Sequence, residues 1–448
     1  MTRPRVVSSS QFTRLNVEAT YLMPPRLLFG SDAHNAHVQN MAAALYEADC
    51  LSEFVTRGVD SARSPVGRWV RRAAGRVAPA IDRHLARRRV EGIPASMVRS
   101  RWAWEIPRLM ANRAGWLRIE DRLWERGEHA LDRHCASLVN RQEVGGFFGV
   151  EHGSLSSLRT ARALGKPGFL AFVSPHHATR QRLVDAEYDR DPSLGSPAAR
   201  DLVALGAVRD RRVDSEIEVA RWFVSNSSFT TRSLVSAGVD ATRVLTVPLG
   251  CPPACTDSEL PSAPPTTMRF LYAGPLSVRK GVHYLLRAWR QARPPGAELH
   301  FFGKPLLPDA AVRRLVGDAL SLGIVFHGPV APDALNAAYL SSSVLVFPTL
   351  CDGFGQVASE ALAHGVPVLT TGNAGAADLI VHGRNGWIVA AADDAALGAQ
   401  LEWCASHPQD VFAMRRPALA SARAWTWLDF RRRFHDLMAT ALHEARGA

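Results

Sequence analysis

Short apolar runs recur along the chain, and helix-like stretches separate them. A continuous run of about four to eight apolar residues is typical of a strand buried on both faces. Strands that alternate with helical stretches indicate a parallel α/β sheet, so the pattern predicts two such sheets. The first half has a polar loop at 31–39 and a helix at 40–48, and its predicted strands are 26–30, 51–56, 146–150, 168–173, 221–225 and 243–247. The second half has predicted strands at 268–274, 297–302, 324–327, 344–348, 367–371 and 387–389.

A segment rich in proline, serine and threonine, residues 251–267, separates the two halves. Dense proline stiffens an extended chain and is excluded from a sheet interior, which favours a linker here. The length of 448 residues also favours more than one domain. We therefore predict a domain at 1–250 with a basic helical region at 57–135, the linker, a second domain at 268–425, and a closing helix at 426–448 that packs back on the first domain. Both domains are expected to be doubly wound and Rossmann-like.

The composition indicates a globular protein, with 47% hydrophobic and 21% charged residues. No apolar run reaches the ~18 residues that a spanning helix needs, and the N-terminus lacks the apolar core of a signal peptide. Six widely spaced cysteines are too few for a disulfide framework. These features predict a cytoplasmic location.

Arginine is concentrated at 63–89, where nine arginines are opposed by one aspartate. Apolar residues recur there at helical spacing, from Trp69 to Leu85, so the segment resembles an amphipathic helix with a basic face. Such a helix can bind an anionic membrane surface on the cytoplasmic side, or it can pack on the first sheet with a solvated face. Nucleic acid is not expected, because no binding fold or interleaved aromatic residues accompany the arginines.

The densest chemical signal is the segment 347–370. A strand there ends in a glycine-bearing turn, and a helix opens near Gln356. The backbone N–H groups of Phe354, Gly355 and Gln356 would then face a ligand at a helix N-terminus, which suits a pyrophosphate. Asp352 lies in the turn and Glu360 about two helical turns later, so they can reach different parts of one ligand. The alternative is an ordinary strand, turn and helix with a solvated Glu360.

A second segment, Gly274 to Gly281, places Arg279 and Lys280 at the predicted start of a helix. Cations at a helix N-terminus oppose the helix dipole, which favours an anionic partner. The alternative is a solvated basic pair.

These two segments resemble the signature of family 4 glycosyltransferases of the GT-B fold. The family motif is an acidic residue, seven others and then Glu. Asp352 and Glu360 have this spacing, with Asp where the family usually has Glu. The runs 365–368 and 383–387 also match. At 274–281 the family arginine is replaced by Pro275, Lys280 matches, and Arg279 is expected to supply the lost charge.

The resemblance implies a retaining hexosyltransferase that uses a nucleotide-diphosphate sugar, with no cofactor and no metal. Lys280, Arg279 and the three backbone N–H groups would bind the donor phosphates, Glu360 the ribose and Asp352 the donor sugar. The acceptor would be a glycan, a lipid-linked sugar or a small molecule. A histidine after the strand 168–173, His176 or His177, would face the reacting carbon, unless the pair lies in a surface loop. His327, within 326–330, would form the wall for the nucleotide base together with 339–348, or would be an ordinary loop histidine.

Other groups fit chemistry less well. His34 and His37 lie in the first loop without further metal ligands, so a solvated or acceptor-side position is expected. Asp189 and Asp191 follow no apolar strand, and Cys251 and Cys255 fall in the linker. Two other functions remain open, namely a nucleotide-sugar epimerase of the same architecture and a non-catalytic nucleotide-sugar-binding module.

Overall fold

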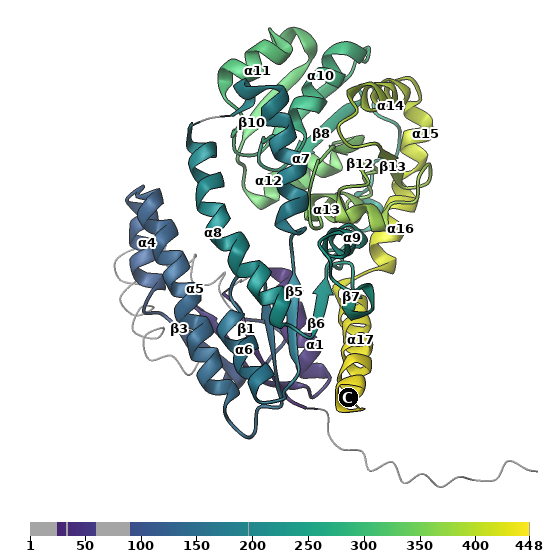
Figure 1. The fold of residues 1–448 in the computed structure, drawn as a ribbon. Helices are drawn as coiled ribbons and strands as arrows, with labels where there is room; N and C mark the ends of the chain where they lie inside the picture. Colours follow the sequence, from purple (N-terminus) through teal and green to yellow (C-terminus); the bar gives the residue numbers. More distant parts are fainter. Residues whose placement is uncertain (1–24, 33–34, 60–89, 196, 448) are drawn as a thin grey trace, which may run out of the picture.

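The computed structural model describes residues 25–32, 35–59, 90–195 and 197–447. Two α/β domains stack end to end, with the N-terminal domain below the C-terminal domain in Figure 1. All strands that pair within the two described sheets run parallel, which confirms the predicted fold class. The basic segment 63–89 lies outside the described residues, and so does His34.

The N-terminal sheet has, in the described part of the chain, seven strands in the order β3-β2-β1-β4-β5-β6-β7. Phenylalanines from neighbouring strands fill its core, and almost every central-strand residue is buried. The strands are β1 Leu27–Gly30, β2 Leu51–Arg57, β3 Val98–Arg101, β4 Gly146–Val150, β5 Gly168–Phe172, β6 Trp222–Ser225 and β7 Val244–Thr246. The helices are α1 Ala36–Glu47, α4 Glu105–Arg113, α5 Leu117–Val139, α6 Leu155–Ala163, α7 His177–Arg190, α8 Pro197–Val219 and α9 Ser228–Ser236.

The C-terminal sheet repeats this winding with the order β10-β9-β8-β11-β12-β13 among the described strands. Its strands are β8 Arg269–Ala273, β9 Glu298–Phe302, β10 Ile324–Gly328, β11 Val344–Phe347, β12 Val368–Thr371 and β13 Gly386–Val389. Its helices are α10 Val282–Ala292, α11 Asp309–Val316, α12 Pro332–Leu340, α13 Gln356–Ala363, α14 Asp394–Ser406, α15 Pro408–Ala413 and α16 Arg415–Ala424, and α17 Trp427–Gly447 follows. The 3-10 turns of both domains are η1 Ala95–Met97, η2 Pro192–Leu194, η3 Ala241–Arg243, η4 Asp257–Glu259, η5 Leu320–Leu322 and η6 Gly375–Leu379.

The predicted strands all form, and the sequence pattern missed β3. This edge strand reads Val-Arg-Ser-Arg, so it has no apolar run to mark it. The prediction of a loop through residue 39 was also wrong at its end, because α1 begins at Ala36. His37 is therefore a buried residue of a helix rather than a loop residue.

Two helices link the domains away from the linker. The last helix, α17, returns to the N-terminal domain and packs against α1, where Arg431 pairs with Glu47 at 3.0 Å (Figure 1). Helix α7 rises from β5 to the C-terminal domain, and its Glu187 accepts from Tyr284 of α10 at 3.0 Å. Leu194, just beyond α7, is buried in the core of the C-terminal domain. The orientation of the two domains is thus fixed by packing on two sides.

None of the helices in the described ranges combines the length and apolar character that crossing a membrane requires.

Candidate functional site

A cavity of about 320 Å³ lies between the two domains. In doubly wound sheets the carboxyl ends of the strands flank a crevice where the strand order reverses, here between β1 and β4 and between β8 and β11. The cavity lies at both of these reversals. The N-terminal domain contributes His37, Val173, Asn226 and Leu249. The C-terminal domain contributes Ala273, Gly274, Pro275, Lys280, Phe347, Asp352, Phe354, Gly355, Gln356, Val357 and Glu360.

Lys280 is the cation of this cavity. Its ammonium group contacts the Asp352 carboxylate and lies 4.9 Å from the centre of the Phe347 ring. Burial, together with the charge of Arg279, lowers the pKa of Lys280 to about 7. Direct contact with Asp352 opposes that shift, because a neighbouring anion favours the charged lysine. An anionic ligand in the cavity would act in the same direction.

The N-terminus of α13 faces the same cavity. Gly355, with φ of 85°, occupies the left-handed region. The turn at this glycine lets α13 begin at the cavity wall. The first N–H groups of a helix have no intrahelical acceptor and carry its positive dipole end. The Phe354 N–H is already engaged, since it donates to Asp352 Oδ1 at 3.2 Å. Gly355 and Gln356 are therefore the better placed of the three predicted donors.

Arg279 lies beside Lys280 but outside the cavity lining. Its guanidinium donates to the Cys351 carbonyl at 2.9 Å and lies 3.5 Å from Asp352. Pro275 lines the cavity on the opposite side of the loop, and its carbonyl accepts from Tyr272 Oη at 2.8 Å. Arg279 thus supports the carboxylate that holds Lys280.

Glu360 is held in place by a tyrosine that the sequence analysis gave only as part of the base wall. Tyr339 is fully buried and donates its hydroxyl to Glu360 Oε2 at 2.9 Å. Since one carboxylate oxygen is fixed in this way, the other can accept from a ligand hydroxyl. The only sequence signal for this pair is a tyrosine near the end of the helix that precedes β11.

The two histidines after β5 point to α8 rather than to the cavity lining. His177 Nε2 lies 2.7 Å from Asp214 Oδ1, and His176 Nε2 lies 3.5 Å from the same oxygen. Three such ligand atoms so close together could hold a metal ion. However, His176 Nδ1 accepts from the Ala178 N–H, which leaves the proton on Nε2, the atom that a metal would need. Burial lowers the pKa of His176, with His177 adding to the effect.

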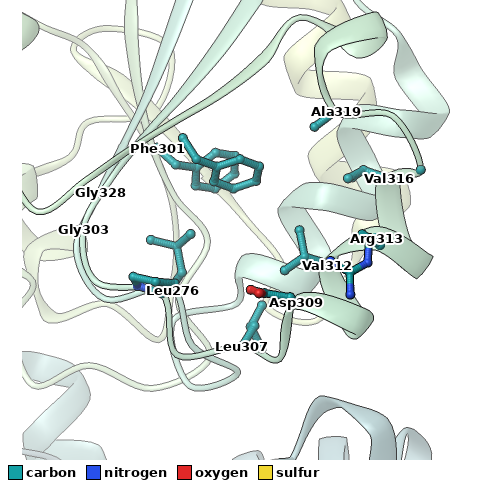
Figure 2. A pocket seen from close by; sticks show the side chains of 13 residues that line it. Leu276, Phe301, Gly303, Leu307, Asp309, Val312, Arg313, Val316, Ala319 and Gly328 are labelled. Atoms are coloured by element: carbon teal, nitrogen blue, oxygen red, sulfur yellow. The ribbon is translucent and has the colours of Figure 1, made fainter.

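His327 lies on the edge strand β10 and outside the cavity lining. It stacks on Phe302 with ring centres 4.2 Å apart, and its Nε2 lies 2.9 Å from His300 Nδ1. A second cavity, of about 340 Å³, lies beside this strand within the C-terminal domain (Figure 2). Its walls are mainly apolar, with Leu276, Phe301 and Val312 among them, and it contains neither Lys280 nor Glu360.

His37 lines the cavity, although the sequence analysis placed it in a loop, in a solvated or acceptor-side position. It comes from the first turn of α1, lines the cavity and is 7% exposed. Its Nε2 has no hydrogen-bond partner among the described residues. No local sequence pattern could show that this helix faces a loop more than 300 positions away.

Residues 267–407 match the family model described as Glycosyl transferases group 1. The C-terminal domain is thus similar to group 1 glycosyltransferases. The chain is 35% identical over 124 residues to an uncharacterized glycosyltransferase of Methanocaldococcus jannaschii, which covers 26% of this chain and 31% of that protein. It is 35% identical over 131 residues to the D-inositol 3-phosphate glycosyltransferase of Pseudarthrobacter chlorophenolicus, which covers 28% of this chain and 31% of that protein. The chain thus spans less than a third of the length of these relatives.

The solved structures extend the likeness from this domain to the fold of both domains. The Anabaena protein HepE, solved in complex with UDP, has a TM-score of 0.56 and 16% identity, and covers 93% of this chain and 100% of that chain. The chain therefore has the GT-B fold.

Proposed function

We propose that this chain is a glycosyltransferase that moves a sugar from a nucleotide-diphosphate donor to an acceptor hydroxyl with retention of configuration. The observation that carries the proposal is the inter-domain cavity, where Lys280, the N-terminus of α13 and Glu360 converge. The group 1 domain supplies all three. Retention is carried over from the family resemblance.

The phosphate chemistry rests on Lys280 and α13. Charge grows on the leaving diphosphate as the glycosidic bond breaks, so fixed positive groups act most strongly in the transition state. Lys280 supplies a full charge, while the N–H groups of Gly355 and Gln356 supply oriented dipoles. The proposal needs no metal for this role.

Glu360 supports a donor with a ribose. A carboxylate can accept from two neighbouring hydroxyls, and Tyr339 keeps Glu360 oriented before the ligand arrives. UDP is the nucleotide bound by HepE, and UDP donors are therefore the first to test. The name of the Pseudarthrobacter relative indicates a phosphorylated cyclitol acceptor for that protein, and we propose a glycan, a lipid-linked sugar or a small polyhydroxyl molecule here.

Hydrogen bonds between the two domains hold the two walls of the cavity together. Ser227 Oγ of α9 donates to the Gly353 carbonyl at 2.6 Å, and the Ser228 N–H donates to Asp378 at 2.7 Å. The first bond holds the N-terminal domain against the turn that precedes α13, and the second holds it against η6.

The test begins with a thermal-shift screen of UDP-, GDP- and ADP-sugars, since a ligand that binds the folded state raises Tm. The selected donor is then incubated in EDTA, with and without acceptor pools. We expect a new glycoside whose proton NMR coupling shows the anomeric configuration of the donor. An epimerised donor without acceptor would support the epimerase, and binding without turnover would support the non-catalytic module. Failure of every sugar nucleotide to bind would refute the proposal.

A further inference from the structure

The N-terminal wall of the cavity includes one side chain, His37, with a buried nitrogen that has no hydrogen-bond partner in the described part of the chain. Val173 and Leu249 are apolar. Both amide atoms of Asn226 already have partners within the protein. Its Nδ2 donates to the Val173 carbonyl at 2.8 Å, and its Oδ1 accepts from Thr230 at 2.9 Å. His37 is the remaining residue of this wall, and its Nε2 has no partner in the described part of the chain.

The position of His37 is fixed by the fold. It lies in the first turn of the helix that follows β1, at the reversal of strand order in the N-terminal sheet. The buried face of α1 packs on the core through Val38 and Met41, so the backbone beside His37 is anchored. A buried polar atom without a partner is costly, and such a site is completed when a ligand or water supplies the bond.

The chemistry of His37 differs from that of the opposite wall. Burial lowers the pKa of His37 to about 4, so its ring is neutral near pH 7. A neutral imidazole carries one N–H donor and one acceptor, which matches an alcohol. Lys280 and the N-terminus of α13 instead offer positive charge and N–H groups, which match a diphosphate. The C-terminal wall therefore matches the nucleotide diphosphate, and His37 matches the sugar that is attached to the diphosphate.

We infer that His37 hydrogen-bonds a hydroxyl of the transferred sugar and helps to select the donor. This inference rests on the proposed function. The histidines after β5, His176 and His177, pair with Asp214 of α8 and are not among the residues that line the cavity, whereas His37 is.

The test compares two ligands that differ only in the sugar. Dissociation constants for UDP and UDP-glucose are measured by calorimetry in wild type, His37→Ala and His37→Gln, with the GDP or ADP pair used if the screen selects it. Loss of one hydrogen bond should weaken UDP-glucose about tenfold in His37→Ala, while UDP changes less than about twofold. Gln carries an amide N–H at similar reach, so His37→Gln should recover part of the loss. Circular dichroism and Tm check that each variant is folded.

Deoxy donors identify the contacted hydroxyl. Removing that hydroxyl should weaken donor binding in wild type by a similar factor and leave His37→Ala unaffected, which a merely structural histidine would not produce. Equal weakening of UDP and UDP-glucose would place His37 at the phosphates, and unchanged affinities would remove the contact. Either result overturns the inference while donor binding by wild type upholds the proposed function. A wild type that binds no sugar nucleotide overturns both.

Discussion

Lys280 gives the sharpest test of the cavity, because its charge state and its ligand are coupled. Burial and Arg279 lower the pKa of Lys280 to about 7 while Asp352 opposes the shift, so a fraction of the lysines in the free protein is neutral at pH 8. Phosphates favour the cation, so a bound diphosphate raises this pKa. Donor binding should therefore take up a proton, and affinity should fall as the pH rises above 7.

The magnitudes follow from the same geometry. A group with a pKa of 7 is ~90% unprotonated at pH 8, so binding should take up as much as ~0.9 proton and affinity should fall ~tenfold per pH unit above 7. A bare unit-charge pair at ~4 Å interacts by ~4 kcal/mol at an effective dielectric near 20. Because Lys280 already contacts Asp352, the net loss in Lys280→Met should be only ~1.5–3 kcal/mol, or ~10- to 150-fold.

Calorimetry in two buffers with different ionisation enthalpies measures the proton uptake directly. Lys280→Arg is the key control, because arginine stays charged and should abolish the pH dependence of binding. Burial raises the pKa values of Glu151 and Glu216 to about 7 and about 8, so these groups also titrate in this pH range. The Lys280→Arg variant retains both glutamates, so any pH dependence that they cause would persist in it. Lys304→Met removes an exposed lysine of the same domain and should bind like wild type. Binding by wild type without proton exchange between pH 7 and 9 would refute the reasoning.

Three further predictions address the ribose contact, domain closure and membrane binding. Glu360→Ala should lower donor affinity by ~1.5–3 kcal/mol and Tyr339→Phe by ~0.5–1.5 kcal/mol, measured by calorimetry. Equal affinities in all three proteins would make Glu360 a surface carboxylate. In Gly353→Ala the new Cβ would lie 2.1 Å from the Val173 carbonyl oxygen where the two domains touch, so the domains should separate at this contact. Small-angle scattering should show a larger radius of gyration with little change in Tm, and an unchanged radius would contradict the closure contact. The nine arginines of 63–89 should bind anionic vesicles at low salt, at ~1 kcal/mol for each engaged arginine, and release them as salt rises. Equal flotation with neutral vesicles would remove this prediction.

Most of the fold could be predicted because buried parallel strands are apolar runs. Residues such as Phe147, Phe169 and Phe270 mark their strands without any alignment, since both faces of each sheet are covered. The edge strand β3 was missed because Arg99, Ser100 and Arg101 are polar and leave no apolar run. Hydrophobic periodicity in the sequence does not mark a polar edge strand of this kind.

The site was predictable where its residues share one segment and not where they meet across the fold. Asp352 and Glu360 lie on one strand, turn and helix, and local geometry brings them to one cavity. His177 is held by Asp214, 37 positions later, and His37 faces a loop of the other domain. Such encounters depend on the packing of whole elements, which a local pattern does not encode.

The return of α17 to the N-terminal domain makes that domain discontinuous in the sequence. Phe430, Phe434 and Met438 share a buried core with Val38 and Met41 of α1. On the ribosome, the C-terminal domain is a continuous segment that can fold as soon as it emerges. The N-terminal domain is synthesised first, yet its apolar surface on α1 stays uncovered until α17 appears. The N-terminal domain therefore completes its core only after the C-terminal domain has been synthesised, although it is the first to emerge.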